Sequence, residues 1–191
     1  METPHYLGVD IGGTKVALRV ETDAGCVDET TFGWAPRHSA ARDLAQLADH
    51  VSELRTRLGV PLRSVGVAMP GTVGPDGRVT AWPSRPEWTG LPLDDSLREL
   101  FPETAVACAD DGDLGALAEA RASCCDALLY IGVGTGVGGG LVLDGSLCPG
   151  LGRGSFEIGH MIVEMDGAHC ASMSKAELVK ELGNARGRTG R

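Results

Sequence analysis

The chain has 191 residues, 42% of them hydrophobic, which is enough to bury a core in one or two domains. Its 26 acidic and 17 basic residues give a net charge of −9, which argues against nucleic-acid binding through a basic patch. No apolar run approaches the roughly 20 residues that span a bilayer, and residues 1–5 lack the pattern of a secretory signal, so we expect a cytoplasmic protein without a membrane partner.

Apolar periodicity predicts an α/β chain in which strand hairpins come first and a long helix follows them. That helix carries leucines at three- and four-residue spacing and ends at Gly59. The predicted strands are 6–10, 16–20, 27–32, 65–69, 105–108, 127–133, 139–143 and 161–164. The predicted helices are 39–58, 93–100 and 112–123. In a reducing cytoplasm the six cysteines are expected to be mostly free, with Cys124 and Cys125 packing as small apolar residues.

A glycine turn follows the first predicted strand and reads D-I-G-G-T-K over residues 10–15. Glycine lets the backbone approach an anion closely, so that free amides and a threonine hydroxyl can bind phosphate oxygens. A carboxylate at the start of the turn can hold Mg²⁺ through water. The alternative is a plain hairpin turn. The residues predicted to form this phosphate and Mg²⁺ site are Asp10, Gly12, Gly13, Thr14 and Lys15.

A second glycine turn, G-V-G-T-G-V-G-G-G over residues 132–140, follows another apolar strand and opens another hairpin. We expect Gly134, Thr135 and Gly136 to hold phosphate there as well. Two such turns far apart in the sequence suggest two domains that close on one polyphosphate.

Five motifs in order resemble the ROK family (repressors, open reading frames, kinases), which includes bacterial glucokinases. The two glycine turns resemble its phosphate-1 and phosphate-2 segments. V-A-M-P-G at 67–71 is similar to its sugar-side G-x-P-G loop, W-T-G-L-P-L at 88–93 to its W-x-G-x-P-L stretch, and E-I-G-H at 157–160 to its E-x-G-H sugar contact. The resemblance implies an actin-like, ribonuclease H-like fold in two lobes with ATP and sugar in the cleft. It also implies sugar contacts at Gly71, Glu157 and His160.

The resemblance also suggests how the chain divides. Residues 1–122 would form the N-terminal actin-like lobe, and 123–170 part of a second lobe that carries the phosphate-2 turn. Residues 171–191 no longer resemble the family, and we expect a divergent, poorly ordered tail. Because family kinases are considerably longer, the chain looks truncated. It would lack the adenosine-binding part and much of the dimer interface, so a homodimer is expected only with those parts present.

The catalytic residue is predicted to be Asp111, in the acidic turn A-D-D-G-D at 109–113. The family pattern at this place reads x-N-D-A-N-A-x-A-L-x-E, and its general base falls on Asp111. A carboxylate that accepts the proton of a sugar hydroxyl orients and activates that hydroxyl. The alternative is a helix N-cap, with which catalysis is compatible. Three carboxylates within four positions repel one another and need an offsetting ligand or cation.

Departures from the family bear on the substrate. Asp110 and Asp113 stand where the family has amides, and Ser84-Arg85 replaces its Asn-Leu. An acceptor-only anion favours a cationic substituent, so one of these two aspartates is predicted to pair with the ammonium of an amino sugar, and Asp110 is the predicted substrate-binding residue. These changes resemble the kanosamine (3-amino-3-deoxyglucose) kinases of ansamycin-type pathways, which belong to the same family. The alternative is glucose as substrate, with Asp113 a solvated first-turn residue.

The zinc-binding pattern of the family breaks down in this chain. Family kinases follow G-H with C-x-C-G-x-x-G-C, whose three cysteines bind structural zinc together with a histidine. Cys170 is present here, but Ser172 and Glu177 stand at the other two cysteine positions. One cysteine and the nearby histidines cannot complete a closed four-ligand site, so no zinc is expected.

The sequence therefore favours ATP-dependent phosphorylation of the 6-hydroxyl of a hexose or aminohexose, with Asp111 as base and Asp10 supporting Mg²⁺. Two alternatives stay open. One is a non-catalytic, sugar-sensing regulator of the same family, although such regulators carry a helix-turn-helix before the first strand. The other is an inactive truncated remnant.

Overall fold

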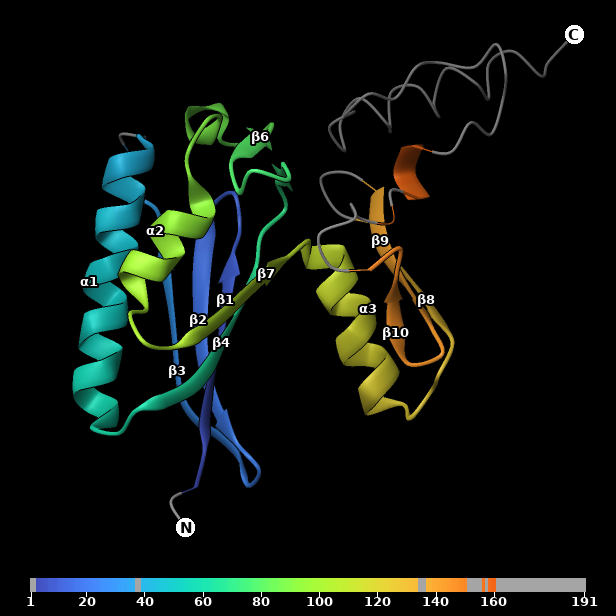
Figure 1. Cartoon of the computed structure of the whole chain (residues 1–191), viewed down its shortest axis with the longest axis horizontal. Coiled ribbons are helices and arrows are strands. Elements are labelled where there is room, and N and C mark those ends of the chain that lie inside the picture. The colour runs from blue at the N-terminus through green and yellow to red at the C-terminus, as the bar shows by residue number, and fades with distance from the viewer. Residues whose placement is uncertain (1–2, 37–38, 134–136, 151–155, 157, 161–191) are drawn as a thin grey trace, which may run out of the picture. The chain divides into compact units, whose positions relative to one another are not determined.

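The computed structural model describes residues 3–36, 39–133, 137–150, 156 and 158–160 (Figure 1). The chain divides into two compact units, Met1–Asp111 and Gly112–Arg191, and the two glycine turns belong to different units. The predicted lobe boundary at residue 122 stays a prediction.

A five-stranded sheet with the order β3-β2-β1-β4-β7 forms the centre of the first unit. Strands β1 (His5–Ile11), β2 (Lys15–Thr22) and β3 (Gly25–Gly33) form an antiparallel meander. Strands β4 (Leu62–Ala68) and β7 (Ala105–Ala109) continue the sheet parallel to β1. Parallel order places the carboxyl ends of β1, β4 and β7 at the same edge of the sheet.

One face of this sheet is buried against two helices, α1 (Ala40–Leu58) and α2 (Leu93–Leu100), and Figure 1 shows α1 running along it. Alternate strand residues supply the apolar face, as the two-residue period of a strand requires. The core residues from β1, β2 and α1 are Leu7, Val9, Ile11, Val16, Leu18, Val20, Leu47, Val51 and Leu54, all at most 2% exposed. Each such side chain contributes about 1.5–3 kcal/mol of burial.

The ends of α1 follow from its sequence. The Ser39 side chain accepts a hydrogen bond from the Arg42 amide at 3.3 Å, which satisfies a free donor of the first turn. Gly59, with φ of 66°, ends the helix and donates its N–H to the Arg55 carbonyl at 3.0 Å. The predicted helix at 39–58 is confirmed.

Short elements between β4 and α2 escaped the sequence prediction. They are the hairpin of β5 (Thr72–Val73) and β6 (Val79–Ala81) and the 3₁₀ turn η1 (Pro86–Trp88). Two or three residues are too few to show a period. Their packing is aromatic: the rings of Trp82 and Trp88 meet edge to face at 4.9 Å, and both side chains are buried.

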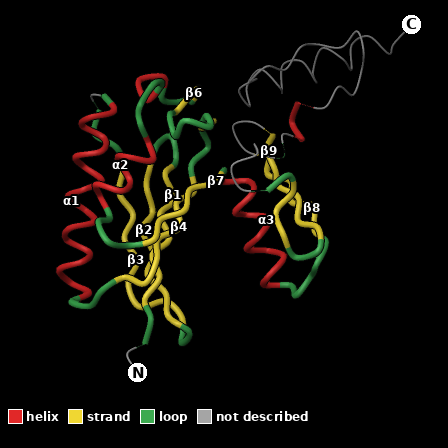
Figure 2. The backbone as a smooth tube through the Cα atoms, viewed as in Figure 1, coloured by secondary structure: helices red, strands yellow, loops and turns green. Residues whose placement is uncertain are grey.

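The second unit packs α3 (Asp111–Ala122) against a three-stranded sheet of order β10-β9-β8 (Figure 2). Its strands are β8 (Leu128–Val133), β9 (Val137–Leu143) and β10 (Ser146–Cys148). Ala116, Ala120 and Val142 form the small core. The turn η2 (Ile158–His160) follows, whereas the strand predicted at 161–164 and the tail at 171–191 lie outside the described residues.

The other predicted helices and strands within the described residues are confirmed, with bounds that shift by at most three residues. The expectation for Cys124 and Cys125 is wrong, because both are exposed in the turn after α3, where Cys124 has a φ of 50°. The cysteines that the structure describes are free: Cys26, Cys108, Cys124, Cys125 and Cys148. Within the described ranges, no helix combines the length and the apolar character needed to cross a bilayer.

Candidate active site

The carboxyl ends of β1, β4 and β7 bring the acidic residues of the first unit to one edge of the sheet. In the register, Asp10 pairs with Ala68, and Ala68 pairs with Ala109. Asp10 is the penultimate residue of β1, and Asp111 comes two residues after the end of β7. The predicted base and the predicted Mg²⁺ residue are thus neighbours, although they lie 101 positions apart in the sequence.

The electrostatics of Asp10 reflect this arrangement. The side chain is exposed, yet surrounding protein removes part of its hydration, and this desolvation raises the pKa of Asp10. The negative charge of Asp111 raises the pKa of Asp10 further, and the positive charge of Lys15 opposes both effects. A carboxylate that is disfavoured in this way is a suitable partner for a cation.

The first glycine turn is tightly built. The Gly12 amide donates to the Lys15 carbonyl at 2.9 Å, and the Trp34 amide donates to the Thr14 carbonyl at 3.3 Å. A Cβ on Gly12 would lie 3.0 Å from the Lys15 carbonyl oxygen. A Cβ on Gly13 would lie 2.7 Å from the hydroxyl oxygen of Ser84. A side chain at either position would force its neighbour to shift, so glycine permits the close approach seen in this turn.

Two buried side chains donate hydrogen bonds to the backbone carbonyls of this turn. Trp34 Nε1 donates to the Gly12 carbonyl at 2.8 Å, and Arg85 Nε donates to the Gly13 carbonyl at 3.0 Å. Arg85 also forms an ion pair with Asp43 at 2.7 Å, and the two side chains are only 3% and 1% exposed. The sequence interpretation placed the change to Arg85 among the features that bear on the substrate. The structure instead buries Arg85 beneath the first turn.

Sequence reasoning missed Trp34 and Asp43. Asp43 carried a signal, because it lies four residues before Leu47 and so falls on the apolar stripe of α1, where a charge needs a buried partner. The identity of that partner carried no local signal, since Arg85 is 42 positions away in the sequence.

Gly71, the predicted sugar contact after β4, is half-buried. A Cβ there would lie 2.8 Å from the Met69 side chain and 3.3 Å from the Ala81 carbonyl oxygen. Close packing against β6 thus accounts for this glycine, and its contact with sugar stays a prediction.

In the second unit the predicted site residues fall largely outside the described part. Gly134, Thr135, Gly136 and Glu157 lie beyond it, and of His160 only the backbone is described. The elements around them are described. Val133 pairs with Val137 at the base of the second turn. A Cβ on Gly159 would overlap the Val137 carbonyl, so this glycine lets η2 lie directly against β9.

Asp113 has a structural partner in the same unit. It is 6% exposed, and its Oδ1 accepts a hydrogen bond from the Phe156 amide at 3.4 Å. The alternative that Asp113 is a solvated first-turn residue is therefore wrong. Its carboxylate connects the start of α3 to the residue before Glu157.

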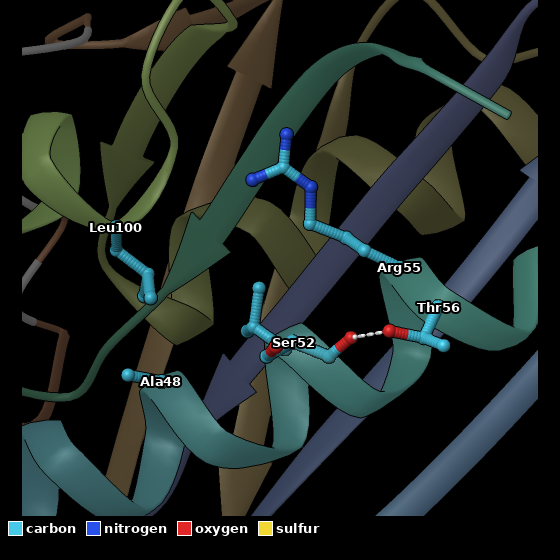
Figure 3. Close-up of a pocket in the computed structure, with 6 residues that line it drawn as sticks. Ala48, Ser52, Arg55, Thr56 and Leu100 are labelled. Carbon is cyan, nitrogen blue, oxygen red and sulfur yellow. Dashed lines mark hydrogen bonds between the residues drawn. The ribbon is translucent and has the colours of Figure 1, made fainter. Parts of the chain in front are cut away.

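One pocket of the first unit shows no link to this chemistry. A shallow pocket on α1, next to Leu100 of α2, is lined by Ala48, Val51, Ser52, Arg55 and Thr56 and contains none of the predicted site residues (Figure 3). The proposed zinc-pattern positions Cys170, Ser172 and Glu177 lie outside the described residues. Within the described ranges, no three His, Cys, Asp or Glu side chains gather closely enough to hold a metal ion.

Comparison with known proteins identifies related chains. The model of the ROK family matches residues 6–176. The kanosamine kinase of Amycolatopsis mediterranei (strain S699) is 70% identical over 170 residues, which is 89% of this chain and 56% of that protein. The glucokinase of Halalkalibacterium halodurans is 28% identical and is covered over 57% of its length. The chain thus spans little more than half the length of the curated relatives it matches.

Solved structures agree with this assignment. The ROK hexokinase from Thermus thermophilus superposes with a TM-score of 0.75 at 28% identity, over 89% of this chain and 57% of that one. The ROK family glucokinase from Streptomyces griseus, solved with glucose and AMPPNP, gives 0.70 at 27% identity, over 89% and 54%. The mixed α/β arrangement is that of the actin-like ATPase fold. The chain belongs to the ROK family.

Proposed function

We propose that this chain carries the phosphate-binding turn and the catalytic base of an ATP-dependent sugar kinase that phosphorylates the 6-hydroxyl of an aminohexose or hexose. The observation that carries the proposal is the meeting of the first glycine turn, Asp10 and Asp111 at one edge of the sheet. The relatives named as a kanosamine kinase and a glucokinase support the proposal of a sugar kinase.

Asp111 acts as general base in this proposal. The sugar hydroxyl oxygen attacks the γ-phosphorus of ATP, its proton passes to the Asp111 carboxylate, and the bond from the γ-phosphorus to the bridging oxygen breaks to leave ADP. Phosphate oxygens accept hydrogen bonds from the amides of the first turn, and Lys15 adds positive charge. Gly134, Thr135 and Gly136 would contact phosphate from the second turn. A phosphate-binding turn beside a general base favours a kinase over a non-catalytic regulator.

The acidic edge of the sheet fits a magnesium ion. Two neighbouring carboxylates, one with a raised pKa, gain from a cation between or beside them. Asp10 would hold the ion through water, and bound Mg²⁺ would neutralise charge on the transferred phosphate.

We propose kanosamine, or a closely similar aminohexose, as the preferred sugar. The relative at 70% identity is named a kanosamine kinase. Asp110, which stands where the family has an amide, would pair with the sugar ammonium through its carboxylate. Gly71, Glu157 and His160 would contribute the remaining sugar contacts.

A coupled assay with the purified chain tests this function. ATP turnover should depend on sugar and be faster with kanosamine than with glucose, and phosphorus–proton correlation NMR should place the new phosphate on the 6-oxygen. Phosphate on another oxygen would refute the assigned position, and no turnover with any hexose or aminohexose would refute the activity of this chain.

A further inference from the structure

Four buried side chains beneath the first glycine turn form one connected polar cluster, which we call the turn clamp: Trp34, Asp43, Arg85 and Trp88. They come from three separate segments: the residue after β3, the first turn of α1, and the loop around η1. Each is at most 9% exposed. The clamp therefore joins parts of the first unit that are distant in the sequence to a single turn.

Asp43 connects the members of the clamp. Its Oδ2 accepts from Arg85 at 2.7 Å and from Trp88 Nε1 at 2.9 Å. The guanidinium of Arg85 also stacks over the Trp34 ring, 4.6 Å from its centre. Arg85 is thereby neutralised, oriented and shielded from solvent, so it is not placed to bind phosphate itself.

The clamp acts on the turn through two carbonyls, those of Gly12 and Gly13, which accept from Trp34 and Arg85. In a trans peptide the C=O and the following N–H point in opposite directions. Holding the Gly12 carbonyl inward therefore points the Gly13 N–H outward, and holding the Gly13 carbonyl points the Thr14 N–H outward in the same way. Such amides are the donors that an anion-binding turn uses.

We propose that Arg85 and Trp34 are positioning residues for nucleotide phosphate, and that they act by fixing the peptide planes of Gly12 and Gly13. The proposal rests on the proposed function, since it assigns the first turn to ATP. Burial of an ion pair is weak evidence for stability, because desolvation offsets its attraction. Within the described part Asp43 Oδ1 has no hydrogen-bond partner, which adds to that cost. Positioning of the turn explains why the pair is present.

Three variants test the clamp. Asp43→Asn/Arg85→Met removes both charges together, leaves an acceptor for Trp88, and deletes the donor to Gly13. Trp34→Phe keeps an aromatic ring and deletes the donor to Gly12, so it serves if the double variant does not fold. The matched control is Asp28→Asn/Arg57→Met, which removes an ion pair of 3.0 Å between β3 and the end of α1.

Amide exchange gives a readout that does not depend on activity. The Gly12 amide is protected by its bond to the Lys15 carbonyl. Losing one carbonyl anchor should speed exchange at Gly12 by roughly three- to tenfold, the equivalent of one hydrogen bond, and leave β4 unchanged. Uniform faster exchange across β1 and β4, or unchanged exchange at Gly12, would overturn the proposal.

Steady-state kinetics separate positioning from a merely structural role. Both clamp variants should raise KM for ATP by roughly three- to tenfold and leave KM for sugar unchanged, whereas the control keeps both constants. A fall in kcat with both KM values unchanged indicates only fewer folded molecules and would overturn the proposal. If the wild-type chain has no turnover, the proposed function fails, and exchange at Gly12 still decides whether the clamp holds the turn.

Discussion

Asp10 at the end of β1 and Asp111 after β7 are electrostatic neighbours, and the charge of Asp111 raises the pKa of Asp10. Two carboxylates so placed repel each other in the free protein. This repulsion costs the free protein some stability, and the cation and phosphate that we propose at this edge would offset it. This relationship has a direct consequence for the dependence of stability on pH.

Asp10→Asn should stabilise the free protein at neutral pH. The pKa of Asp10 is higher in the native state than the unfolded value of 3.8. Between these two pKa values the native state binds more protons than the unfolded state, so stability falls as pH rises from the lower to the higher of them. The asparagine side chain does not ionise, so the variant does not lose stability in this way as pH rises. Thermal unfolding from pH 3.5 to pH 7 without Mg²⁺ should show the variant gaining on the wild type as pH rises. Asp23→Asn, in the exposed turn between β2 and β3, is the control, and a variant less stable than wild type at pH 7 would contradict the assignment.

Arg85→Met alone should destabilise the fold strongly. The substitution leaves Asp43 charged, 1% exposed and without its cation, and breaking a buried pair in this way costs about 3–5 kcal/mol. Adding Asp43→Asn should recover a large part of that loss, because the stranded charge is gone. Urea unfolding of the single and double variants measures both values. Equal unfolding free energies for wild type and Arg85→Met would show that the pair is not buried as described.

Cys108 should resist alkylation. Burial first, and then the charges of Asp94 and Asp110, raise the pKa of Cys108 to about 11, so little thiolate is present at pH 8. Cys26 and Cys124 are exposed and should react. Peptide mass spectrometry after brief iodoacetamide treatment of the native chain measures the order in which the cysteines are alkylated. Labelling of Cys108 as fast as Cys26 would contradict it, and the denatured chain, in which every cysteine reacts, is the control.

Local patterns predicted the elements that have enough residues to show a period. The apolar stripe and Gly59 predicted α1, and apolar periodicity predicted the strands. Two-residue β5 and three-residue β6 carried no period, and β10 was missed for the same reason. Cys124 and Cys125 were misplaced because their small size fits a core as well as a turn, and only the turn after α3 decides.

Local motifs likewise predict some parts of the candidate site and not others. The strand–turn motifs around Asp10 and Asp111 are local, and parallel strand order brings them together. The turn clamp is not local, since Arg85 and Asp43 meet only through the packing of α1 against the loop before α2. Asp113 could not be assigned from its neighbours, because its partner is the amide of Phe156.

The sugar preference should depend on Asp110. A hydrogen bond to a charged group contributes about 1.5–3 kcal/mol, which corresponds to a preference of tenfold or more for kanosamine over glucose. Asp110→Asn should reduce the ratio of the two kcat/KM values, and the ratio should also fall as pH rises through the pKa of the sugar amine. Asp144→Asn, in the exposed turn between β9 and β10, is the control. An unchanged ratio in Asp110→Asn would remove this residue from the sugar site.

The most direct test of the account is turnover of ATP and kanosamine by the wild-type chain and by Asp111→Asn, measured beside sugar affinity. As general base, Asp111 should contribute roughly 10²–10⁴-fold, so the variant should lose that factor in kcat with little change in sugar affinity. Asp111 begins α3, so circular dichroism and thermal unfolding should confirm that the variant is folded. The variant should be a folded, sugar-binding protein that has lost turnover, and near-normal turnover in Asp111→Asn would contradict the role of Asp111 as general base.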